Sequence, residues 1–128
     1  MRFESLNMKD GEKYVTLTAT PEIWRDILGI VDSYSHFGPE LRSYTTILPR
    51  QAQTAREELQ KLVNTNQSQF ITSQDIFNTI QVLVREYDDF GYGGLKKITE
   101  KDAKIDKARY SALALECKEV AEQMKAAS

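Results

Sequence analysis

Hydrophobic and polar residues alternate near the start of the chain, which is typical of β-strands with one buried face. Asp10-Gly11 interrupts the alternation and supplies the two positive-φ residues that a two-residue hairpin turn requires. The pattern predicts a β-hairpin in which Leu6 faces Val15 and Glu4 faces Leu17. One face of this hairpin carries Leu6, Met8, Val15, Leu17 and Ala19, and the other carries Phe3, Tyr14, Thr16 and Thr18.

An isolated hairpin is only marginally stable in water, so it must pack on helices or pair with another strand. The short run Gln69-Phe70-Ile71-Thr72 precedes one strongly apolar segment, as residues 16–19 precede another. We therefore expect this run to be a third strand.

Apolar residues recur at three- and four-residue spacing over four segments, which predicts four amphipathic helices. The first begins with Thr20 as N-cap and Pro21 at the first helical position, and ends near Gly38-Pro39. The second and third cover residues 46–63 and 74–89. The fourth opens near Thr99, close to a capping box, and has no helix breaker before Ser128. Residues 39–48 fit a short strand, a helical turn or neither.

Two stretches of the chain, residues 20–38 and 73–91, align without a gap at a separation of 53 positions. Two amphipathic helices with similar caps would share part of this pattern. The common Tyr-x-x-Phe-Gly ending is not required by helical periodicity, so it favours an internal duplication. The identical pairs are Ile23/Ile76, Ile27/Ile80, Val31/Val84, Tyr34/Tyr87, Phe37/Phe90 and Gly38/Gly91.

These elements predict a mainly α protein of the α+β class, with an N-terminal β-hairpin and four main helices. The 128 residues, 41% of them hydrophobic, are enough for one core, so we expect a single domain over residues 1–128. Its parts are the hairpin (2–19) and two related helix–loop–helix units (20–64 and 69–128) about a pseudo-twofold axis.

Charge and cysteine content narrow the class of protein further. The chain has 17 Lys and Arg residues against 19 Asp and Glu, a formal net charge of −2, which excludes a polycationic nucleic-acid-binding tail. One cysteine cannot form an intramolecular disulfide, and the chain starts with polar residues, so we expect a cytoplasmic location. No run approaches the roughly 18 apolar residues of a membrane span, and we expect no contact with a membrane.

Candidate catalytic and metal-binding groups are sparse. His36 lies four residues after Asp32 and four before Glu40, but no nucleophile is paired with it, so a surface histidine is favoured. One His and one Cys cannot supply a zinc site, and no acidic run fits a calcium loop. The glycines before Lys96-Lys97 lack the spacing of a phosphate-binding loop. We expect no catalytic site, no cofactor and no metal.

Two aromatic–glycine segments, residues 34–38 and 87–94, follow the first and third helices. Their Tyr and Phe side chains could be the last core contacts before a glycine C-cap. Alternatively, the two segments converge and present rings and bare backbone to a partner or ligand. The candidate binding residues are Tyr34, His36, Phe37, Tyr87, Phe90, Tyr92, Lys96 and Lys97.

The fourth helix carries a narrow apolar seam with a three- and four-residue progression, which is typical of packing on a single neighbour. The helix at 46–63 could be that neighbour, but it is shorter, so part of the seam is left for a second copy of the chain. We therefore predict a homodimer contact through Leu113, Cys117, Val120 and Met124, with Cys117 as a buried and unreactive thiol.

The sequence has an excess helix seam, aromatic loops and a potential free strand edge, but no catalytic motif. The function expected from these features is association with another protein and with itself, without catalysis. An alternative is a small-molecule or nucleotide binder, with a pocket between the duplicated units and Lys96 or Lys97 neutralising phosphate. A nucleic-acid-binding surface over residues 96–109, which are locally basic, is a weaker alternative, because a solvated helix explains the same charges.

Overall fold

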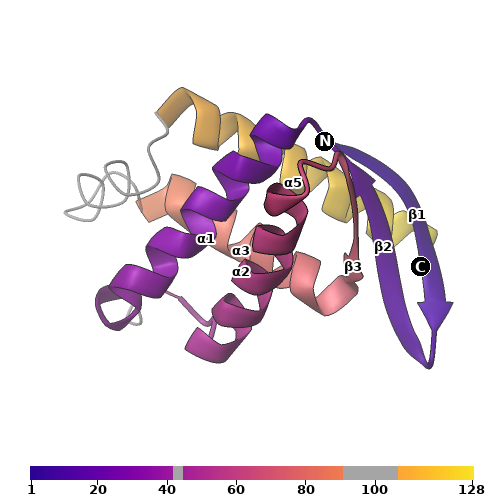
Figure 1. Ribbon diagram of the computed structural model, residues 1–128, viewed down its shortest axis with the longest axis horizontal. Helices are drawn as coiled ribbons and strands as arrows, with labels where there is room; N and C mark the ends of the chain where they lie inside the picture. Colours follow the sequence, from indigo (N-terminus) through magenta and orange to yellow (C-terminus); the bar gives the residue numbers. More distant parts are fainter. Residues whose placement is uncertain (42–44, 91–106) are drawn as a thin grey trace.

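The computed structural model describes the backbone of residues 1–41, 45–90 and 107–128, and the side chains of 1–34, 45–87 and 108–128. Within these ranges the chain forms an α+β fold in which an antiparallel three-stranded sheet lies on one side of four helices (Figure 1). The elements are β1 (Arg2–Lys9), β2 (Glu12–Thr18), α1 (Pro21–Leu41), α2 (Pro49–Asn64), β3 (Gln69–Ser73), α3 (Gln74–Phe90) and α5 (Lys107–Ala127).

The N-terminal hairpin turns where the sequence predicts it. Asp10 and Gly11 both have positive φ, 53° and 79°, as a two-residue turn with right-handed twist requires. Leu6 pairs with Val15 as expected, and Val15 is fully buried. The turn sequence therefore determines the register of this end of the hairpin.

The other end of the hairpin differs from the prediction because β1 contains a bulge between Phe3 and Ser5. Leu17 pairs with Phe3 and not with Glu4, so the predicted Glu4–Leu17 pair is wrong. An extra residue reverses which face the preceding side chains occupy. Phe3 consequently packs against the core and not on the opposite face.

Met8 is a second correction to the predicted core face of the hairpin. It lies near the turn and is 63% exposed. The turn end of the hairpin extends away from the helices (Figure 1), which is consistent with this exposure.

The third strand forms as the sequence predicts. β3 pairs antiparallel with β2, with Thr16 opposite Ile71 at the centre of the pairing and Leu17 opposite Phe70 next to it. The sheet order is β1-β2-β3, which leaves β1 and β3 as the two edges.

The starts of α1 and α3 are capped in the same way. The Thr20 hydroxyl accepts a hydrogen bond from the Ile23 N–H at 3.3 Å, and the Ser73 hydroxyl accepts one from the Ile76 N–H at 3.2 Å. Each cap satisfies one of the N–H groups that lack a partner within the helix.

The end of α1 does not match the prediction, because the helix continues past Gly38 and Pro39 to Leu41. Proline has a helical φ, so it removes one backbone hydrogen bond without preventing the following turn. The segment from Tyr34 to Gly38 is therefore helix and not a loop. Residues 45–48 have no regular structure, and the capping sequence predicted at Thr99 lies outside the described residues.

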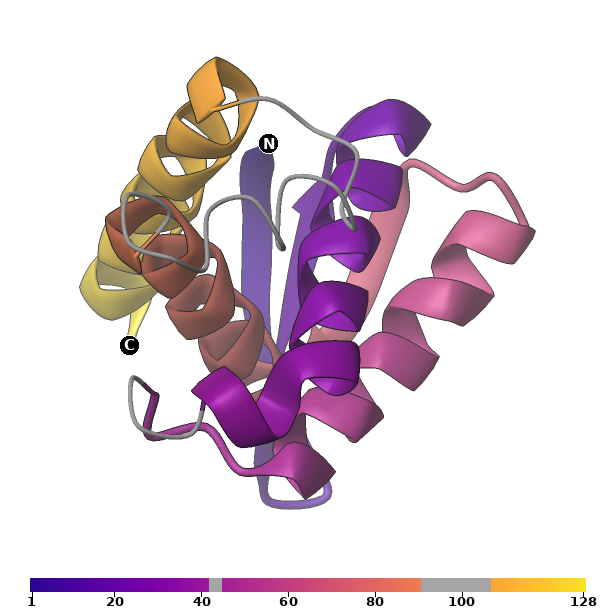
Figure 2. The same ribbon diagram turned by 90° about the vertical axis from the view of Figure 1, so that its left-hand side faces the viewer.

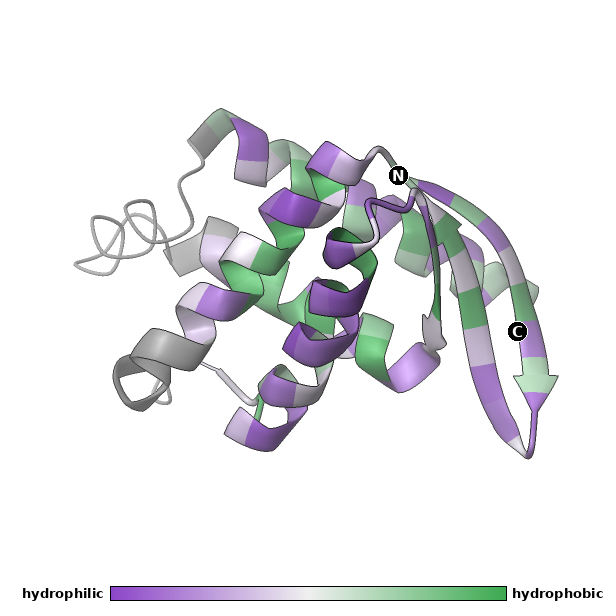
Figure 3. Ribbon diagram, viewed as in Figure 1, coloured by the Kyte–Doolittle hydropathy of each residue, from purple (hydrophilic) through white to green (hydrophobic). Residues whose placement is uncertain are grey.

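The core lies between the sheet and the helices. The outer surfaces of the helices carry hydrophilic residues, and α2 carries the most conspicuous run of them (Figure 3). Trp24 of α1 connects the two layers. Its side chain is 1% exposed, its Nε1 donates to the Ser68 carbonyl at 2.8 Å, and its ring meets Phe70 edge-on at 5.2 Å. α1 is thereby held against the start of β3.

The last helix packs on α3 and β1, and not on α2 as the sequence analysis considers. Figure 2 shows the order: α5 and α2 lie at opposite sides of the helical layer, with α3 and α1 between them. This placement decides which helix borders each edge of the sheet.

Candidate functional site at the open edge of the sheet

Two of the aromatic residues proposed from the sequence to bind a partner lie in the core. Tyr34 is 3% exposed and its hydroxyl donates to the Ile47 carbonyl. Tyr87 is 8% exposed, and its ring meets Tyr110 of α5 edge-on at 4.7 Å. Neither ring is presented to a partner at the surface.

The other members of that set are described in part or not at all. His36 and Phe37 lie on α1 and Phe90 ends α3, but their side chains are outside the described ones. Tyr92, Lys96 and Lys97 lie outside the described residues altogether. The convergence of the two aromatic–glycine segments therefore stays a prediction.

The residues predicted to form a homodimer contact are covered by their own chain. Leu113, Cys117, Val120 and Met124 are each between 1% and 4% exposed. α3 and β1 cover this seam, because α5 crosses both elements. Self-association, which stays a proposal, would need a different surface.

Burial raises the pKa of the Cys117 thiol to about 12, and the neighbouring Glu116 carboxylate acts in the same direction. The thiolate is the reactive form of cysteine. At pH 8 we therefore expect Cys117 to react with a thiol reagent at least about a hundredfold more slowly than a free thiol does. Labelling with a chromogenic disulfide should be slow in the folded protein and immediate in guanidinium chloride. An exposed cysteine made by Ala112→Cys should react at once, and equal rates at the two positions would contradict the expectation.

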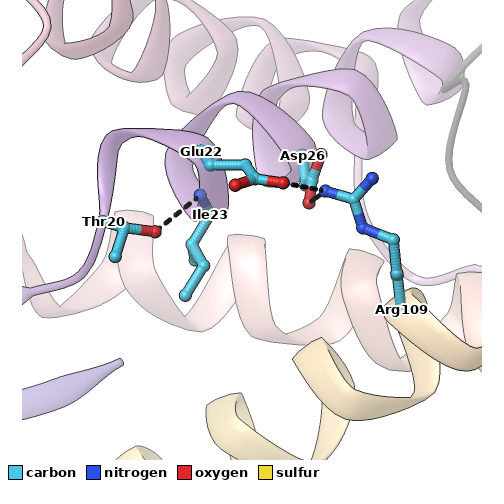
Figure 4. A network of polar contacts seen from close by, with 5 residues as sticks. All are labelled: Thr20, Glu22, Ile23, Asp26 and Arg109. Carbon is cyan, nitrogen blue, oxygen red and sulfur yellow. Dashed lines mark hydrogen bonds and ion pairs between the residues drawn. The ribbon is translucent and has the colours of Figure 1, made fainter.

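Ion pairs connect α1 to the two outer helices, α5 and α2. Arg109 of α5 contacts Glu22, at 3.0 Å, and Asp26 (Figure 4). On the other flank, Arg56 of α2 bonds Asp32 at 2.6 Å. These ion pairs therefore join α1 to α5 and α1 to α2.

Asp26 has the more buried carboxylate at the Arg109 contact, with its side chain 15% exposed. Burial raises the pKa of this carboxyl, while the adjacent Arg109 guanidinium acts to lower it. Because the folded-state pKa is above the usual value, ionisation of Asp26 costs stability as the pH rises through it.

We expect Arg109→Met to raise the pKa of Asp26 further, because the lowering effect of the guanidinium is lost. The variant should be about 1 kcal/mol less stable at pH 7, and the difference should shrink as the pH falls and Asp26 is protonated. An NMR titration of the Asp26 carboxyl and urea unfolding at both pH values measure this. Arg50→Met, on the exposed side of α2, is the control. An unchanged Asp26 pKa in Arg109→Met would contradict the assignment.

The two sheet edges differ in how they are protected. β1 has a bulge and carries charged residues, Arg2, Glu4 and Lys9. Bulges and charges are the usual means of preventing another strand from pairing with an edge. β3 has the sequence Gln-Phe-Ile-Thr-Ser, with no charge, no proline and no register shift. Its central residue, Ile71, is 60% exposed.

A groove of about 350 Å³ runs beside the β3 edge. α2 forms its other wall, because that helix lies outside β3 on the side away from β2 (Figure 2). Its lining residues are Glu58, Lys61, Leu62, Thr65, Gln67, Gln69, Phe70 and Ile71.

A second groove, of about 440 Å³, lies between α2 and α3 and is lined by residues such as Ile47, Gln51, Asp75 and Val82. Neither groove is lined by an aromatic candidate from the sequence analysis.

The described side chains provide no candidate for a metal site, and the described helices provide none for a membrane span. Among them, no three His, Cys, Asp or Glu residues are grouped as a metal site would require. In the same part of the chain, no helix has the length and apolar character needed to cross a membrane.

Comparison with known proteins does not assign a family or a function to this chain. No family model, curated protein or solved structure matches this chain. We take the edge of β3 and its groove as the candidate site, and Ile71 is not among the candidate residues named from the sequence. The signal available in the sequence was a five-residue strand without charge, but strand order decides whether such a strand is buried or at an edge.

Proposed function

We propose that this protein is a small cytosolic binding protein without catalytic activity, and that it associates with another protein through the open edge of β3. The observation that carries the proposal is the contrast between the two edges. β1 is bulged and charged, whereas β3 is regular, uncharged and exposes Ile71 beside a groove. An unprotected edge is a template for strand pairing, and main-chain hydrogen bonds then supply affinity. The single cysteine supports a reducing compartment.

The proposal includes an internal duplication about a pseudo-twofold axis. Among the elements that the structure describes, the order strand–helix–helix occurs twice, as β2-α1-α2 and as β3-α3-α5. At the separation of 53 positions, Leu17 corresponds to Phe70, and these two residues pair with each other. The flanking pairs, Thr16 with Ile71 and Thr18 with Gln69, exchange corresponding positions. A twofold axis between two antiparallel strands would produce this register.

Burial supports the same relationship. Residues 53 positions apart on α1 and α3 are buried alike, as in the pairs Trp24/Phe77, Ile27/Ile80, Ile30/Leu83, Val31/Val84 and Tyr34/Tyr87. The buried residues of α2 recur in α5 at one constant separation, as Ala52/Tyr110, Ala55/Leu113, Leu59/Cys117 and Leu62/Val120. A shared seam is expected of any two helices, so the strand register is the stronger support.

If the two caps are equivalent, Thr20→Ala and Ser73→Ala should have similar effects. Each loses a hydrogen bond to the N–H three residues later, so each should lower the free energy of unfolding by about 1 kcal/mol. Urea unfolding followed by circular dichroism measures both values. Thr54→Ala, in the interior of α2, is the control without a cap, and an effect at only one of the two caps would count against equivalence.

The association is tested by placing a photo-crosslinking amino acid at Ile71. Met8 is the matched control because it is similarly exposed, 63% against 60%, but lies on the protected edge. In a lysate of the source cells, we expect illumination to give one discrete protein adduct from position 71 and none from position 8. Absence of an adduct at 71 would contradict the proposal. Native mass spectrometry showing a retained small molecule instead would favour the small-molecule alternative.

A further inference from the structure

We infer that the partner contributes an extended peptide segment, which pairs with β3 as a fourth strand and fills the groove between β3 and α2. This inference rests on the proposed function and names the kind of partner that the site fits. Its support comes from the direction of the β3 backbone groups, the shape of the groove, and the way β1 packs on the other edge.

The backbone of β3 offers hydrogen-bonding groups toward the groove. The Ala19 N–H donates to the Ser68 carbonyl at 3.0 Å, and this pair continues the register of β2 and β3. Hydrogen-bonded pairs alternate along an antiparallel ladder, so Phe70 and Thr72 bond β2. Gln69 and Ile71 consequently direct their N–H and C=O groups to the open edge.

The groove fits one extended segment of modest charge. Its lining includes the buried Leu62 of α2 and Phe70 of β3, and on the α2 side Glu58 and Lys61, which have opposite charges. In a bound strand, alternate side chains would point between α2 and the sheet. Apolar side chains at those positions, without a strong net charge, match this lining.

The chain contains its own example of such a strand. β1 pairs with the outer edge of β2 and packs against α5, with Phe3 and Leu6 turned to the core. In the proposed duplication, α2 corresponds to α5 and β3 to β2. The position corresponding to β1 is then the groove beside β3, where the described part of the chain places no strand. A peptide resembling β1 in its apolar alternation is the expected occupant.

A second folded copy fits this edge less well than a peptide does. β3 has five residues, which at about 3.4 Å each span about 17 Å. A contact between two folded copies along this one short strand would bury much less than the roughly 800 Å² per partner of a stable interface. α2 also stands outside β3, so a second copy would bring its own α2 to the same place (Figure 2). A single strand needs only about 4.8 Å beside β3.

The test selects peptides from a phage-displayed library of random dodecapeptides on the intact protein. We expect the enriched peptides to alternate apolar and polar residues, and to slow hydrogen exchange of the Gln69 and Ile71 amides at least about tenfold, as measured by NMR. Ile71→Pro removes the outward N–H, so it should weaken binding at least about tenfold. Met8→Pro, at an exposed position of β1, should leave binding unchanged.

Folding of each variant is checked by circular dichroism. If Ile71→Pro does not fold, Ile71→Lys replaces it, because a lysine on the edge opposes strand pairing. The inference is overturned if no peptide is enriched, if the peptides bind Ile71→Pro equally well, or if they protect amides outside β3. It is also overturned if sedimentation shows a dimer that Ile71→Lys dissociates, since a second copy would then be the occupant. If a protein still crosslinks at position 71 when any of these results is obtained, the proposed function stands and only the peptide inference fails. If no protein crosslinks there, the proposed function and the peptide inference both fail.

Discussion

Replacing Trp24 by alanine should lower the free energy of unfolding by about 3–5 kcal/mol, which is a large part of the 5–15 kcal/mol that stabilises a typical domain. Trp24 is 1% exposed and contacts Phe70 of β3 edge-on. Alanine would leave a cavity between α1 and the sheet. It would also leave the Ser68 carbonyl without its indole donor.

The variant Trp24→Phe separates these two losses. Phe77 of α3, which aligns with Trp24 at the separation of 53 positions, is also 1% exposed, so a phenylalanine ring is compatible with such a buried position. It keeps most of the packing but cannot donate to Ser68, and we expect a loss of about 1–3 kcal/mol. Urea unfolding monitored by circular dichroism gives both values. A loss below about 1 kcal/mol for Trp24→Ala would mean that α1 is not held to the sheet through this residue.

The parts of the fold that sequence reasoning predicted depend on local chemistry. Asp10-Gly11 favours a tight turn, and Thr20 followed by Pro21 favours the start of a helix, and neither preference depends on how the segment packs. The apolar spacing of α3 likewise marks its buried face. Each of these signals lies within a few residues of the structure that it specifies.

The parts that were missed depend on contacts between distant segments. The bulge at Glu4 turns Phe3 toward the core, and nothing near Glu4 in the sequence indicates it. The seam of α5 indicates a neighbour but not whether that neighbour is α2, α3 or a second copy. The open edge at Ile71 follows from the strand order, which only the assembled sheet defines. The sequence therefore indicates a potential free strand edge, but it does not place that edge at Ile71.

Tyr34→Ala and Tyr87→Ala should each lower the free energy of unfolding by about 3–4 kcal/mol, because both rings are buried. Tyr34 also holds residues 45–48 through its bond to the Ile47 carbonyl. Tyr34→Phe keeps the ring and removes this bond, so we expect a loss of about 1–2 kcal/mol. Tyr87→Leu keeps apolar volume but loses the edge-to-face contact with Tyr110, at a cost of about 0.5–1.5 kcal/mol.

These tyrosine variants also decide between the two interpretations of the aromatic residues. Because Tyr34 and Tyr87 are buried in the core, crosslinking from position 71 should fall only in proportion to the unfolded fraction. Tyr34→Phe and Tyr87→Leu, which stay folded at 25 °C on these values, should crosslink as the wild type does. A variant that keeps the wild-type stability but loses the crosslink would instead assign its tyrosine to binding. The open edge of β3 would then be at most one part of a larger interaction surface.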